Sequence, residues 1–72
     1  MKKINKIKIR VNGKFKSVYD NFSVSDLLKN LKIPMKKVAI ELNQEIIDKK
    51  NISNINLKKN DKIEIVHFIG GG

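Results

Sequence analysis

Residues 63–72 read IEIVHFIGGG, an apolar strand pattern that runs without a linker into three glycines. The β-branched and aromatic side chains in this segment suit a pleated, half-buried surface. Glycine has no Cβ and buries no side chain, so we expect residues 69–72 to form a flexible tail. Fully extended, those four residues span roughly 14 Å, enough to carry a terminal carboxylate into a narrow cleft. The pattern favours Gly72 as the working group, although a glycine-rich end is also typical of a disordered extension without function.

The composition excludes several classes of protein. The 72 residues contain no cysteine, which excludes disulfides and thiolate chemistry, and His67 is the single histidine, too few ligands for a metal site. No stretch approaches the roughly 20 apolar residues of a membrane span, and the lysine-rich start lacks the apolar run of a signal peptide. We therefore expect one cytoplasmic domain over residues 1–72, which binds no cofactor or metal, contacts no membrane and is not an enzyme.

The net charge of +9 raises the question of a nucleic-acid partner. Arg10 is the only arginine among the 16 basic residues, so the bidentate contact to phosphate or guanine is scarce. The lysines are scattered along the chain, and we expect none to be interleaved with aromatic platforms that could stack on bases. We therefore expect no nucleic-acid partner, and interpret the charge as favouring solubility or attraction to an acidic protein surface.

The first half of the chain predicts a hairpin followed by a helix. Apolar and basic residues alternate over residues 5–11, and Asn12-Gly13 predicts a tight turn into a returning strand over residues 15–19. Ser23 followed by Asp26 resembles a capping box at a helix start. The helix would have a single apolar stripe, made of Val24, Leu27, Leu28 and Leu31. Pro34 prevents the helix from running on.

The second half predicts three further strands, at residues 38–42, 45–47 and 63–69, separated by an irregular loop over residues 48–56. Three apolar side chains are expected to pin this loop to the core: Ile52, Ile55 and Leu57. The element order predicts an α+β domain, with one main helix packed on one face of a mixed sheet of four to five strands.

The opposite face of that sheet should remain in water. Ile63 and Ile65 would then face the helix, while alternation places Val66 and Phe68 on the open face beside the tail. These two side chains could form a partner-binding patch or simply be exposed singly. His67 shares the parity of Ile63 and is expected near the edge of the core, since neither a substrate nor a partner for a general base is evident.

A terminal carboxylate is ionised and unreactive at neutral pH, so it needs activation, most simply as a mixed anhydride with a nucleotide phosphate. The sequence has no phosphate-binding glycine loop and no dinucleotide fingerprint. A second protein would therefore have to supply the activation.

Residues 38–47, VAIELNQEII, and residues 60–72, NDKIEIVHFIGGG, closely resemble the ThiS-type sulfur carriers of thiamine biosynthesis. That family belongs to the ubiquitin-like β-grasp superfamily, and the hairpin at Asn12-Gly13 and the following helix fall at its usual positions. Gln44 and Asn60 stand where relatives often have glycine. We expect both turns to be kept, because asparagine tolerates left-handed backbone.

The resemblance implies a specific chemistry. Gly72 would be adenylated by an ATP-dependent, E1-like adenylyltransferase of the ThiF type and then converted to a thiocarboxylate, a 1-thioglycine. A cysteine desulfurase would supply the sulfur as a persulfide, and a thiazole synthase of the ThiG type would receive it. Gly70 and Gly71 would thread the partner active sites, and Val66, Phe68 and Ile69 would form the docking patch.

Three alternatives remain open at this point. The small subunit of molybdopterin synthase resembles this fold and also ends in a diglycine. A basic β-grasp domain that binds nucleic acid would account for the charge. A third alternative is a tag conjugated to lysines of other proteins.

Overall fold

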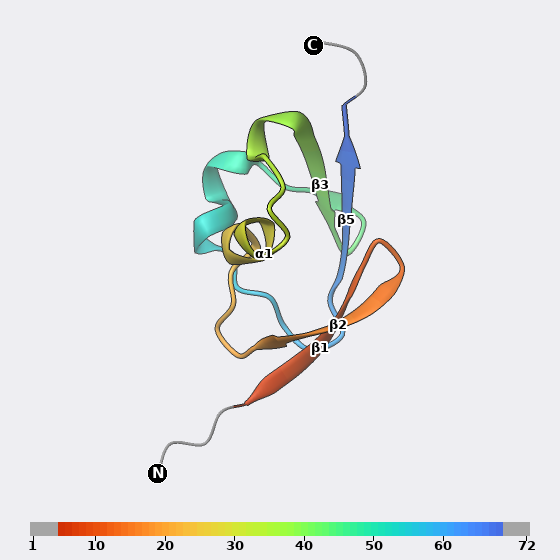
Figure 1. Cartoon of the computed structure of the whole chain (residues 1–72), viewed down its shortest axis with the longest axis vertical. Coiled ribbons are helices and arrows are strands. Elements are labelled where there is room, and N and C mark those ends of the chain that lie inside the picture. Colours follow the sequence, from red (N-terminus) through yellow and green to blue (C-terminus); the bar gives the residue numbers. More distant parts are fainter. Residues whose placement is uncertain (1–4, 69–72) are drawn as a thin grey trace.

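A five-stranded mixed sheet with the strand order β2-β1-β5-β3-β4 forms the frame of the molecule in the computed structural model, which describes residues 5–68 (Figure 1). The elements follow in chain order: β1 (Lys6–Val11), β2 (Lys14–Tyr19), α1 (Val24–Asn30), η1 (Met35–Lys37), β3 (Val38–Leu42), β4 (Glu45–Ile46), η2 (Lys49–Asn54) and β5 (Lys62–His67). The predicted α+β class, the mixed sheet and the single main helix are confirmed, with five strands observed.

The first two strands form the predicted hairpin. Asn12 has φ 51° and Gly13 has φ 82°, so both central turn residues adopt the left-handed backbone that this turn requires. The antiparallel register pairs Val11 with Lys14 and Lys6 with Tyr19. Alternation along β1 buries Ile9 and exposes the basic residues on the opposite face.

Helix α1 begins with the predicted capping box. The Ser23 Oγ accepts a hydrogen bond from the Asp26 N–H, and the Asp26 carboxylate accepts one from the Ser23 N–H, both at 3.0 Å. Leu31 caps the other end, and Lys32 turns to φ 58°. The helix therefore stops before Pro34 is reached, and the apolar stripe is fully buried except at the half-buried Leu31.

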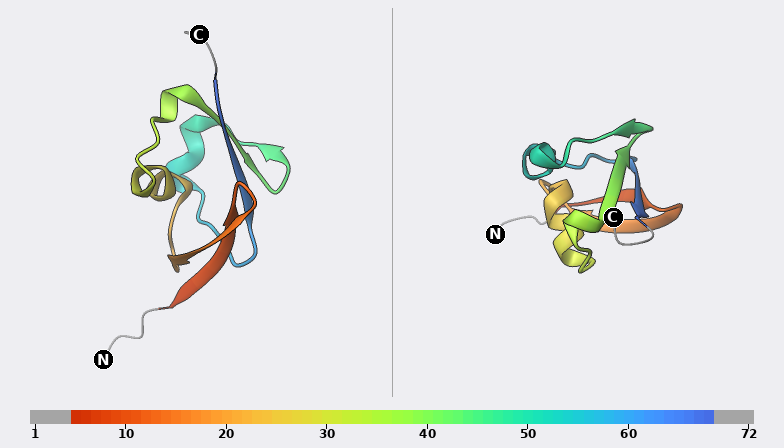
Figure 2. Two further views of the ribbon diagram at one scale, coloured as in Figure 1. Left: turned by 45° about the vertical axis from the view of Figure 1, so that its right-hand side comes forward. Right: turned by 90° about the horizontal axis from the view of Figure 1, so that it is seen from above.

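Strand β5 lies at the centre of the sheet, parallel to β1 and antiparallel to β3. The helix and η2 lie together on one side of this sheet (Figure 2). Beneath them are the buried apolar residues of the core: Ile9, Val18, Val24, Leu27, Leu28, Val38, Ile40, Ile52, Leu57, Ile63 and Ile65. The prediction that Ile63 and Ile65 face the helix is confirmed.

Residues 48–56 are more regular than the sequence predicted. A 3₁₀-helix, η2, occupies Lys49–Asn54, because the Asp48 side chain caps it by accepting a hydrogen bond from the Lys50 N–H at 2.9 Å. The predicted anchoring is confirmed, since Ile52 and Leu57 are buried and Ile55 is half-buried against the core.

The turns expected at Gln44 and Asn60 are present. Asn43, Gln44 and Asn60 all have left-handed backbone, with φ 52°, 73° and 71°. Within residues 5–68, no helix is long and apolar enough to cross a lipid bilayer.

Candidate functional site

The end of β5 is where the chain leaves the sheet. Its last ladder pair joins His67 to Val38, and the Phe68 N–H then donates to the Lys37 carbonyl at 2.9 Å. The main chain is therefore held in place up to Phe68, immediately before the predicted tail. Ile69, Gly70, Gly71 and Gly72 lie outside the described residues.

Two of the predicted docking residues are described, and both are exposed. Val66 is 54% exposed and Phe68 is 56% exposed. Val66 pairs with Ala39 and lies on the face of the sheet opposite the core. The predicted place on the open face is confirmed for Val66, and Phe68 is exposed just beyond the end of the ladder.

Sequence reasoning missed Lys49, which lies over Phe68, and Met35, to which Lys49 is bonded. The Lys49 Nζ lies 5.2 Å from the centroid of the Phe68 ring and also donates to the Met35 carbonyl at 3.1 Å. Met35 is itself 42% exposed. Met35, Val66 and Phe68 are called the exit patch below. A methionine in a short connector and a lysine fourteen positions further on give no sequence signal for this contact, because η1, η2 and β5 meet only in the fold.

His67 corrects one expectation. It was predicted near the edge of the core, but its side chain is exposed. The reason is its position in the last pair of the β3–β5 ladder, at the end of the sheet and beyond the buried Ile65.

The described residues contain no group of three or more histidine, cysteine or acidic side chains that could hold a metal ion. The pKa of Asp26 is lowered from its ordinary value of 3.8, mainly because its carboxylate accepts the Ser23 backbone hydrogen bond of the capping box. This shift belongs to the start of the helix and indicates no catalytic role.

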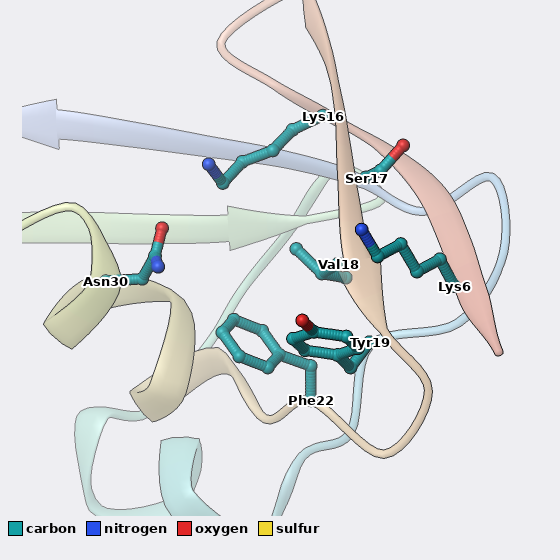
Figure 3. Close-up of a pocket in the computed structure, with 7 residues that line it drawn as sticks. All are labelled: Lys6, Lys16, Ser17, Val18, Tyr19, Phe22 and Asn30. Atoms are coloured by element: carbon teal, nitrogen blue, oxygen red, sulfur yellow. The ribbon is translucent and has the colours of Figure 1, made fainter. Parts of the chain in front are cut away.

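A small hollow lies between the end of β2 and α1 (Figure 3). Tyr19 and Phe22 lie side by side along one side of it, and Asn30 faces them from the helix. Its volume is about 110 Å³, whereas ligand pockets in proteins usually have about 300–1,000 Å³. None of its lining residues is a carboxylate or an imidazole, so this hollow offers neither the room nor the groups of an active site.

The open face of the sheet corrects a second expectation, that basic residues and aromatic rings would not be interleaved. The Lys6 Nζ lies 5.3 Å from the Tyr19 ring centroid, and the Lys8 Nζ lies 5.5 Å from that of Phe15. The Arg10 guanidinium carbon is 4.8 Å from the same Phe15 ring. The residues are separated in the sequence, and the hairpin brings them together on one face.

Comparisons with known proteins agree with this geometry. Residues 9–72 match the ThiS family. The chain is 42% identical over 65 residues to the sulfur carrier protein ThiS of Bacillus subtilis, covering 89% of this chain and 98% of that protein. It is 38% identical over 66 residues to the thiazole synthase of Paramagnetospirillum magneticum, covering 92% of this chain and 20% of that protein. The chain thus spans only about a fifth of the length of that thiazole synthase.

A solved structure shows the same architecture. The crystal structure of the thiamine biosynthesis protein ThiS from Geobacter metallireducens superposes with a TM-score of 0.79 at 32% identity, covering 92% of this chain and all of that one.

Proposed function

Because this chain belongs to the ThiS family, we propose that it is a sulfur carrier protein of thiamine biosynthesis, with Gly72 as the residue that carries the sulfur. The observation that supports this most strongly is the match to the Bacillus subtilis carrier along 98% of that protein's length. The molybdopterin synthase alternative has no such support among these relatives.

The geometry at the end of β5 suits a carrier. The main chain is held as far as Phe68 by its hydrogen bond to the Lys37 carbonyl. Four further residues reach about 14 Å when extended, so the Gly72 carboxylate can enter a partner's active site while the folded domain stays outside. Gly70 and Gly71 would pass through the narrow part of that site, because they have no side chains.

The carboxylate would be activated by a second protein. We assign this step to an E1-like, ThiF-type adenylyltransferase, which uses ATP to form an acyl adenylate at Gly72. The outer sulfur of a persulfide made by a cysteine desulfurase would then attack the Gly72 carbonyl carbon and displace AMP, which forms an acyl disulfide. Because this chain has no cysteine, a thiol of a partner protein would reduce the S–S bond and release the thiocarboxylate. The resulting thiocarboxylate carries one sulfur in place of one carboxylate oxygen, and this chain acts as a co-substrate and not as an enzyme.

We assign a thiazole synthase of the ThiG type as the acceptor of the sulfur. The support is that proteins named thiazole synthase contain a segment similar to nearly all of this chain, at 38% and 35% identity. The exit patch and Ile69 are the residues that would contact this partner.

The test is the intact mass of the purified chain after incubation with the activating enzyme, ATP and a sulfur source. We expect a product in which one oxygen is replaced by sulfur, and no such product from a variant that lacks Gly71 and Gly72. The proposal is overturned if that truncated variant still supports thiazole formation in cells that lack the wild-type chain.

A further inference from the structure

A cluster of cations lies on the open face of the sheet, at the end opposite the exit patch. Arg10 on β1 pairs with Phe15 on β2 and with Lys62 on β5, so these three residues form one row across three strands. Paired residues of neighbouring strands share a face. Since Ile9 and Ile63, the adjacent positions, are buried under the helix, the row faces away from the core.

This row forms a shallow pocket of about 220 Å³, called the basic pocket below. The residues that line it are Lys8, Arg10, Phe15, Asn60 and Lys62. No carboxylate is among these lining residues, so three cations surround the pocket. Asn60 has φ 71° and donates from its backbone N–H to the Lys8 carbonyl at 2.8 Å, which places the 58–60 turn at the rim. Like charges that line one pocket repel one another, and an anion in the pocket would relieve the repulsion.

The aromatic ring decides which kind of anion fits best. The Arg10 guanidinium and the Lys8 ammonium already lie over Phe15, at 4.8 Å and 5.5 Å from its centroid. A nucleic-acid strand would need the free face of such a ring for base stacking. A guanidinium stacked on a ring keeps its N–H edge available, and that edge matches a carboxylate in a bidentate pair.

We infer that the basic pocket binds carboxylate side chains on the acidic surface of a protein partner. Lys62, Glu64 and Val66 lie on the same face of β5, because alternate residues of a strand share a face. Lys62 and Val66 are about 13 Å apart along the strand, so one partner could cover both the basic pocket and Val66 in the exit patch. The inference goes beyond the carrier role, because it rests on residues of β1, β2, β5 and the turn before β5 and on none of the predicted docking residues.

The test is an amide-resolved NMR titration of the full chain with poly-L-glutamate at low ionic strength. We expect the largest shifts at Lys8, Arg10, Phe15 and Lys62, and binding that weakens as salt is added. The double variant Arg10→Glu/Lys62→Glu should weaken binding about tenfold or more, because it reverses the charge of the pocket. If that variant does not fold, Arg10→Gln/Lys62→Gln replaces it. This second variant removes the same cations without introducing acids, and it should also weaken binding.

The matched control is Lys29→Glu/Lys50→Glu, which changes the net charge equally but at exposed positions on α1 and η2. We expect it to change the affinity by about twofold or less, because these positions are not in the pocket. An equal loss in the control would show attraction to net charge alone and would overturn the inference. Tighter binding of a single-stranded oligothymidine than of poly-L-glutamate, with shifts centred on Phe15, would overturn it as well.

Discussion

Asn12 links the hairpin turn to the central strand. β1 and β5 share only two register pairs, and β1 ends at Val11, so the main chain of Ile65 extends past its strand neighbour. The Asn12 side chain supplies the hydrogen bonds that a neighbouring strand would otherwise make to Ile65. Its Oδ1 accepts from the Ile65 N–H at 2.7 Å, and its Nδ2 donates to the Ile65 carbonyl at 3.3 Å.

Asn43 has a similar position on the other side of β5. Its Oδ1 accepts from the Lys62 N–H at 2.9 Å, and its Nδ2 donates to the Asp61 carboxylate at 3.0 Å. Both asparagines have left-handed backbone, so one residue type satisfies the turn and also bonds the neighbouring chain.

We predict that Asn12→Gly lowers the free energy of unfolding by about 1–3 kcal/mol, because it leaves the part-buried Ile65 main chain without its two hydrogen bonds to the Asn12 side chain. Glycine retains the left-handed backbone, so the loss is not caused by turn strain. Asn12→Asp should be intermediate, since a carboxylate accepts from the Ile65 N–H but cannot donate. Urea unfolding gives the free energy of unfolding of all three proteins. A glycine variant as stable as the wild type would contradict the role of the Asn12 side chain in holding Ile65.

The stability of helix α1 depends on its two ends and on its buried apolar stripe. Seven residues are too few for a helix that is stable in isolation, so packing of Val24, Leu27 and Leu28 on the sheet has to maintain it. The capping box orients its first turn, and its Asp26 carboxylate binds best when ionised, which is why the pKa of Asp26 is lowered.

The capping box predicts a pH dependence. A carboxylate whose pKa is lower in the folded protein than in the unfolded chain stabilises the fold above the ordinary value of 3.8, and this stabilisation is lost as the pH falls through the folded pKa. Wild type should therefore be more stable than Asp26→Asn at neutral pH. The difference should disappear well below pH 3.8, when both side chains are neutral.

The measurement is urea unfolding of both proteins from neutral pH to well below pH 3.8, because the two proteins differ only at position 26. A difference between wild type and variant that stays constant with pH would show that the ionised form of Asp26 has no part in the cap. Ser23→Ala provides the companion variant and should cost about 1 kcal/mol at neutral pH.

The strand order of the sheet brings parts of the chain that are distant in sequence to the two ends of β5. Its start lies beside the β1–β2 hairpin, and its end lies beside η1 and η2. One strand therefore joins a basic region to an apolar one, and the predicted tail continues from the apolar end.

The exit patch supports a prediction that rests on the proposed partner. Phe68→Ala and Val66→Ala should each weaken binding to a thiazole synthase about 5- to 30-fold, which corresponds to about 1–2 kcal/mol, because exposed apolar side chains at the centre of an interface dominate its affinity. Both variants should change the free energy of unfolding by less than about 0.5 kcal/mol, since surface substitutions rarely do more.

Ile46→Ala is the matched control. Ile46 is 79% exposed and pairs with Glu41 on the same open face, but it belongs to the edge strand β4 and not to the exit patch. Calorimetric titration of the three variants distinguishes the patch from general surface hydrophobicity. Equal losses at Ile46 and Phe68 would contradict a localised docking surface.

Local patterns in the sequence predict much of this fold. The hairpin at Asn12-Gly13, the capping box at Ser23 and the anchoring of Ile52 depend on neighbouring residues or on simple alternation, and the structure confirms all three. The 3₁₀-helix η2 was missed, because the asparagines and the serine that follow its cap, Asp48, favour turns equally well.

The sequence by itself determined the class of the fold, the buried face of each strand and the family to which the chain belongs, since these follow from periodicity and turn chemistry within short segments. Only the tertiary structure decided that Lys49 adjoins Phe68 and bonds to Met35, that His67 lies beyond the core and that Arg10 stacks on Phe15 beside Lys62. Such contacts depend on strand order and register between segments far apart in the chain, and no local pattern encodes these distances.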